Sequence, residues 1–180
     1  MTDTVRYTYT RAPKVAWGWG LMTLSLLLRP LSALALAARG RPLPEKETVR
    51  GAVRETVLLA GILVSPFLTR HELWADRLML HQGLNFGGSI SYRDIAAVHA
   101  TERTATGFPL RLYPHTLFLA LWPVNLVAIR LRRPQRFRLF HLLPGWKVRE
   151  VVINVDRRDA FIADLRSRVA AAQTDEARKQ

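Results

Sequence analysis

The feature that most constrains the fold is a long apolar block near the N-terminus. Residues 15–38 contain a single charged residue, Arg29, which Pro30 follows directly. A straight transmembrane helix needs about 20 apolar residues to cross a hydrocarbon core of about 30 Å, so the block is long enough to span a bilayer. Trp17 and Trp19 lie near its start and basic residues flank both ends. Such residues are typical anchors at a membrane interface.

The pair Arg29-Pro30 leaves other arrangements open. A central arginine costs about 2.5–3.5 kcal/mol on insertion scales, and an internal proline kinks or breaks a helix. Two half-length helices lying in the interface, or a re-entrant hairpin, therefore fit the same pattern. A cleaved signal peptide ending near 33–35 and a buried soluble helix are further alternatives. Association with a membrane is the interpretation that we favour.

A second apolar block covers residues 57–68 and contains Pro66 near its end. Twelve helical residues reach only about 18 Å, which is too short for a span. A helix or strand packed on the following domain is the simpler interpretation. We therefore assign residues 1–65 to an N-terminal region of hydrophobic, membrane-associated helices.

After residue 66 the pattern changes to short, strand-like runs. Apolar residues alternate or cluster over 72–82, 89–100, 117–131 and 148–153, and turn signals lie at 85–88, 133–135 and 144–145. A helix is predicted over 158–171, because Phe161, Leu165 and Val169 recur every four residues and Asp156 can cap its start. These patterns predict an α+β domain over 66–172, followed by a disordered polar tail over 173–180.

Two stretches of this domain resemble a known family. The run HELWADRLMLHQGLNFGGSISYRDIAAVHA resembles the opening of bacterial pleckstrin-homology-like (PH-like) domains. The run VVINVDRRDAFIADLRSRV is similar to the last strand and helix of that family. The matching positions in the first run are Leu73, Asp76, Leu78, Gly83, Ile90, Asp94 and Ile95.

The resemblance covers roughly residues 68–172 and implies a small PH-like β-barrel or bent sandwich closed by a C-terminal helix. Many relatives carry transmembrane helices beside the domain, which agrees with the apolar blocks. The family has no shared enzymatic activity, and its members resemble binding or assembly modules. The resemblance therefore implies a binding role.

The charge of the chain indicates the kind of partner. It has 27 Lys and Arg against 14 Asp and Glu, a formal charge of +13, which favours polyanionic partners. If 133–135 form a turn, Arg130 and Arg132 share a strand face with Arg136 and Arg138 across the hairpin. We predict that these four arginines contact an anionic partner. The alternative is a solvated outer face.

Catalytic, cofactor and metal sites are not expected. The chain has no cysteine, which excludes thiol catalysis and zinc–thiolate sites. Its five histidines are scattered without an i,i+4 pair, and no glycine-rich nucleotide motif is present.

We therefore predict a non-enzymatic binding or scaffold module at the cell membrane. Its domain faces the cytoplasm and contacts anionic lipid or an acidic protein partner. The alternative is a soluble nucleic-acid-binding protein that uses the same arginines. Few aromatic residues lie among them, which disfavours stacking on single strands.

Overall fold

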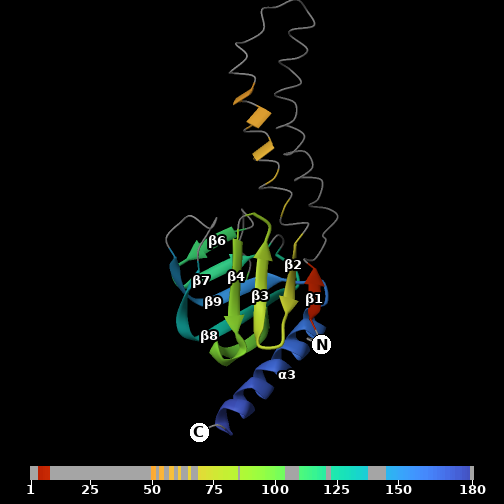
Figure 1. Cartoon of the computed structure of the whole chain (residues 1–180), viewed down its shortest axis with the longest axis vertical. Helices are drawn as coiled ribbons and strands as arrows, with labels where there is room; N and C mark the ends of the chain where they lie inside the picture. The colour runs from red at the N-terminus through yellow and green to blue at the C-terminus, as the bar shows by residue number, and fades with distance from the viewer. Residues whose placement is uncertain are drawn as a thin grey trace, which may run out of the picture. The chain divides into compact units, whose positions relative to one another are not determined.

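The computed structural model describes residues 4–8, 69–84, 86–103, 110–120, 123–137 and 145–178, together with scattered helical residues between 50 and 65. The chain divides into two compact units, one formed by Met1–Arg11 with Pro66–Gln180 and the other by Ala12–Ser65. The first unit contains two β-sheets and a C-terminal helix (Figure 1). The predicted α+β class is therefore confirmed.

The first sheet is antiparallel and follows the chain order β1-β2-β3-β4. Its strands are β1 (Val5–Thr8), β2 (Arg70–Leu73), β3 (Arg77–Gln82) and β4 (Phe86–Ser91). A 3-10 turn, η1 (Tyr92–Asp94), leads into the second sheet. The strands of that sheet are β5 (Ile95–Thr101), β6 (Leu110–Tyr113), β7 (Thr116–Leu119), β8 (Leu126–Phe137) and β9 (Trp146–Asn154). Their order is β5-β8-β9-β7-β6, and β7 runs parallel to β9.

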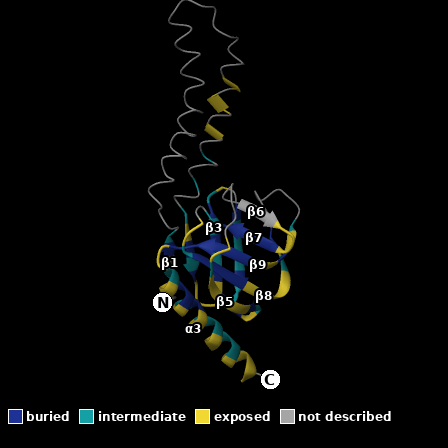
Figure 2. Cartoon of the chain, turned by 180° about the vertical axis from the view of Figure 1, so that it is seen from behind, coloured by how far each residue is buried: buried dark blue, intermediate teal, exposed yellow. Residues whose placement is uncertain are grey.

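One apolar core joins the two sheets to the helix α3 (Arg158–Ala177), and Figure 2 shows the buried strands around it. It contains Leu78 and Ile90 from the first sheet, Ile129 and Val151 from the second, and Phe161 from α3. Within the described strands no backbone pairing joins one sheet to the other. Of the two predicted forms, a barrel or a bent sandwich, the barrel is not found among the described strands, and the core lies between two separate sheets and a helix.

The strand β1 belongs to this unit although it precedes both apolar blocks. It pairs with β2 so that Thr8 lies opposite Arg70. Its central side chain, Tyr7, is buried, whereas Arg6 on the opposite strand face is exposed. The predicted boundary placed residues 1–65 together, whereas the structure inserts the segment with the apolar blocks between two neighbouring strands of one sheet.

The predicted turn at 85–88 is wrong, because β4 begins at Phe86. The chain turns instead around Gly83, whose φ of 58° lies in the left-handed region that glycine adopts without steric cost. Gly88 serves packing within β4. A Cβ there would lie 2.9 Å from Cζ of Phe86 and 3.0 Å from Cδ1 of Phe137, so the missing side chain makes room for two core rings.

The predicted helix over 15–38 lies outside the described residues. In the second block Val57, Leu58 and Gly61 are helical. Among the residues that the structure describes, no helix is long and apolar enough to cross a membrane. The prediction of hydrophobic N-terminal helices therefore gains no support.

The C-terminal helix differs from its prediction at both ends. It continues to Ala177, so residues 173–177 are helical where a disordered tail was predicted. At its start the N-cap residue is Arg157, which makes no capping hydrogen bond through its side chain. Asp156 binds β1 instead, because its backbone N–H donates to the Thr8 carbonyl at 3.0 Å and its carboxylate accepts from the Thr8 hydroxyl.

Candidate anion-binding site

The predicted arginine hairpin is wrong. Strand β8 runs without a turn from Leu126 to Phe137, so Arg130, Arg132 and Arg136 follow one another along one strand. All three are exposed. Arg138 lies outside the described residues.

The residues predicted to form the turn lie in a bulge of β8. Arg130 is opposite Glu150 of β9, and the next pair is Gln135 with Val148. Residues 131–134 of β8 therefore face the single residue Arg149. Extra residues of this kind bend a strand and redirect its side chains, and they often lie near functional sites. A bulge also accommodates a proline such as Pro134, which cannot donate to a regular ladder.

The bulge forms one wall of an open groove of about 540 Å³, which we call the bulge groove. Its lining comes from four strands and the β6–β7 turn: Ala96, His115, Thr116, Arg130, Leu131, Arg132, Pro134, Arg149 and Glu150. Three arginines thus surround a hollow that contains one carboxylate. Arg149 was not among the predicted site residues.

The carboxylate of the bulge groove already has cationic and neutral partners. Arg103 donates from Nη1 to Oε2 of Glu150 at 2.7 Å, and the Thr116 hydroxyl donates to the same oxygen at 3.3 Å. Within the part of the chain that the structure describes, neither Arg130 nor Arg149 has an ion-pair partner. The groove therefore has an excess of positive charge that an anion would neutralise.

The backbone of His115 holds the groove together. Its carbonyl accepts the N–H groups of Arg149 at 2.7 Å and of Glu150 at 3.1 Å, which joins the β6–β7 turn to β9. Its φ of 70° is in the left-handed region, which histidine visits more often than most residues. Sequence reasoning missed His115 and Arg149, because only the parallel pairing of β7 with β9 brings them together.

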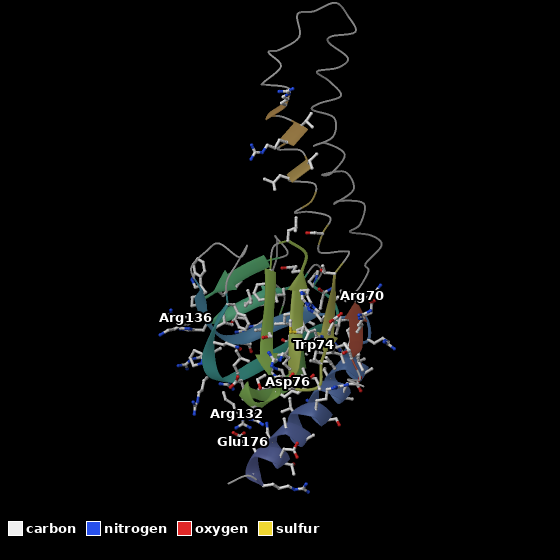
Figure 3. The ribbon with its side chains drawn as sticks, in the orientation of Figure 1. Arg70, Trp74, Asp76, Arg132, Arg136 and Glu176 are labelled. Carbon is white, nitrogen blue, oxygen red and sulfur yellow. The ribbon has the colours of Figure 1, made fainter. Side chains whose placement is uncertain are left out.

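A second open groove, of about 620 Å³, is lined by residues of the bulge, η1 and α3, and we call it the α3 groove. It is lined by Ser91, Arg93, Asp94, Arg132, Arg133, Gln173, Glu176 and Ala177. Arg132 therefore contributes to both grooves. In Figure 3 it lies beside Glu176, whereas Arg136 points into solvent at a distant edge of the sheet. The predicted arginines that the structure describes do not form one patch.

A metal centre is not found in the described part of the chain, where no group of three or more histidine or acidic residues is placed to hold an ion.

No protein-family model, curated protein or solved structure matches the chain.

Proposed function

We propose that this chain is a membrane-associated, non-enzymatic binding module whose β8 arginines contact anionic lipid headgroups on the cytoplasmic side of the cell membrane. The observation that carries the proposal is the exposure of Arg130 and Arg132 at the bulge of β8, with Arg136 also exposed further along the strand. Each basic residue near an anionic leaflet contributes about 1 kcal/mol of attraction. The apolar block at 15–38 supports the choice of a lipid surface over an acidic protein.

We further propose that the module is a variant of the PH-like fold. The chain order supports this assignment, because an antiparallel four-stranded sheet is followed by a second sheet and a terminal helix. On this view the β6–β7 hairpin is an addition at the edge of the second sheet, next to β9.

The pairing of β1 with β2 restricts how the inserted segment can meet a bilayer. The chain leaves the sheet at Thr8 and re-enters it at Arg70, and these two residues are direct partners. Because one sheet cannot lie on both sides of a membrane, the segment between them enters and leaves on the same side. We therefore propose that any membrane crossings within this segment are even in number, which is not compatible with 15–38 as a lone span.

This restriction gives a labelling result. The chain has no native cysteine, so single cysteines at the exposed positions Thr4 and Ala171 can be labelled selectively. Because the module is proposed to face the cytoplasm, a membrane-impermeant maleimide should label both positions in inverted vesicles and neither position in spheroplasts. Labelling of the two positions from opposite sides would contradict the pairing of β1 with β2 in the membrane-bound protein.

The proposed contact with anionic lipid is tested with a fluorescent probe at the bulge groove. Ala96 is exposed and lines this groove, so A96C carries an environment-sensitive dye with little change in packing. The full-length chain is placed in bilayer nanodiscs of phosphatidylcholine, with or without added phosphatidylglycerol. We expect the emission to shift to the blue only with the anionic lipid and to recover in high salt, which screens surface charges.

The matched variant is R130E/R132E. Removing two attractive contacts of about 1 kcal/mol each lowers the ratio of bound to free module by about 30-fold, and charge reversal lowers it further. The same dye at T4C, directly before β1, is the positional control and should not respond to the anionic lipid. The proposal fails if A96C responds equally on neutral and anionic discs, the result expected of a module that binds an acidic protein instead.

A further inference from the structure

The bulge groove differs from an ordinary basic surface in how its charges are arranged. Arg130, Arg132 and Arg149 line one hollow, although β8 and β9 contribute them separately. Among the lining residues that the structure describes, the only carboxylate is that of Glu150, which is bound by Arg103 and Thr116. Guanidinium groups bind phosphate oxygens through paired N–H donors, which fixes both distance and direction. Such a hollow can therefore select an anion by its shape as well as by its charge.

We propose that the bulge groove is a binding site for a phosphomonoester, with Arg130, Arg132 and Arg149 as the residues that hold its terminal phosphate. The inference deepens the proposed function and rests on it, because the phosphomonoester in question belongs to a lipid headgroup or to a small soluble metabolite with the same terminal group. It adds Arg149 to the arginines predicted from the sequence.

The number of arginines favours a monoester over a diester. A terminal phosphate has three free oxygens and a charge of about −1.5 to −2 near neutral pH. A diester has two free oxygens and a single charge, so it would leave one of the three guanidinium groups without a partner. A carboxylate also has two oxygens and a single charge, so it too would leave one guanidinium group without a partner. The hollow of about 540 Å³ also leaves room for the group to which the phosphate is attached.

The backbone fixes the site before any ligand arrives. The bulge places residues 131–134 opposite Arg149, and the His115 carbonyl binds the Arg149 N–H at 2.7 Å. Arg132 is also oriented, because its Nε donates to the Ile95 carbonyl at 3.3 Å. A ligand that meets a preformed site loses less free energy to ordering of the protein.

The α3 groove is the competing location. It has three arginines as well, but Asp94 and Glu176 line the same hollow. Two carboxylates oppose an incoming phosphate, whereas the bulge groove has one carboxylate that Arg103 already binds. The balance of charge therefore favours the bulge groove.

The test compares two variants that each remove one positive charge from β9. R149Q removes a lining residue of the bulge groove, whereas K147Q removes an exposed charge two positions away that does not line it. The backbone hydrogen bond of Arg149 to His115 survives the substitution. The full-length chain in neutral nanodiscs is titrated with glycerol 3-phosphate and with inorganic phosphate. In a parallel arm, A96C dye emission is measured on discs with phosphatidic acid or phosphatidylglycerol, matched in surface charge.

We expect R149Q to weaken phosphomonoester binding by at least about tenfold, as for loss of a charged hydrogen bond, and K147Q by less than about twofold. Binding of glycerol 3-phosphate identifies a soluble ligand, and a response to phosphatidic acid alone identifies a headgroup; either supports the inference. Equal weakening by both variants, equal responses to phosphatidic acid and phosphatidylglycerol, or no binding in either arm overturns it. If A96C still responds to anionic lipid in those cases, the proposed function stands without the specific site.

Discussion

Replacing Tyr7 with alanine should destabilise the module by about 3–5 kcal/mol, as other large-to-small aromatic substitutions in cores do. Tyr7 is 3% exposed, and its ring packs edge-to-face on Phe161 of α3 with centroids 4.9 Å apart. Its hydroxyl donates to the Asp164 carboxylate, and the Arg157 guanidinium lies 5.4 Å from its ring centre. One side chain of a four-residue strand therefore contacts several positions of the terminal helix.

The measurement is urea unfolding of the full-length chain in a mild detergent, followed by the fluorescence of its tryptophans. Y7F keeps the ring and removes only the donor to the Asp164 carboxylate, so it should cost about 1.5–3 kcal/mol, less than Y7A. R6A is the control on the same strand, since Arg6 is exposed and its ion pair with Glu72 contributes at most about 1 kcal/mol. Equal effects of Y7A and R6A would show that β1 is not part of the folded module.

The strand β1 illustrates a limit of sequence reasoning. Four residues are too few for a periodic signal, and the partner strand begins at Arg70, beyond both apolar blocks. The contacts that hold β1 are long-range, and they include the two carboxylates Asp156 and Asp164. Asp156 satisfies the local rule for a helix cap, but it binds Thr8 instead. Local patterns cannot show such a choice, because the competing partner is remote in the sequence.

Where the signal is local, the sequence is informative. The four-residue spacing of Phe161 and Leu165 predicts the buried face of α3, and both side chains are fully buried. The strand-like run predicted over 72–82 contains the end of β2 and the whole of β3, which pair in a hairpin. The interruption of 117–131 at Pro123 and Asn125 is compatible with one or two strands, and the structure has two, β7 and β8, with Asn125 before β8 at a positive φ of 51°.

The candidate site could be predicted from the sequence only in part. The arginines of β8 are visible in the sequence as a charge cluster, but Arg133-Pro134-Gln135 has the composition of a turn. A bulge and a turn both accommodate proline, so composition does not separate them. Whether the segment is a turn or a bulge affects the proposed function. A hairpin would place the arginines on one face, whereas the bulge brings two of them together with Arg149.

Acid should weaken the module through one buried imidazole, His71. Its side chain is fully buried, and its Nδ1 accepts the His81 backbone N–H at 3.4 Å. Burial, with a smaller contribution from the nearby His81, lowers the pKa of His71 from 6.5 to about 3. The unfolded chain therefore binds a proton at His71 near pH 6.5, whereas the folded chain binds that proton only near pH 3. Because the unfolded state binds more protons in this window, the free energy of unfolding falls as the pH decreases from about 6.5 towards 3, by up to about 1.4 kcal/mol per pH unit.

The variant that isolates this effect is H71N. An asparagine amide oxygen can accept near the position of Nδ1 and does not titrate in this range. Its absolute stability will differ from that of the natural chain, so the informative quantity is the slope of unfolding free energy against pH. Carboxylates such as Glu72, whose pKa is lowered chiefly by the hydrogen bond from Trp74, contribute to both profiles and cancel in the difference. We expect a shallower slope between about pH 6.5 and 3 for H71N than for the natural chain. Parallel profiles for the natural chain and H71N would contradict the burial of a neutral His71 imidazole in the folded module.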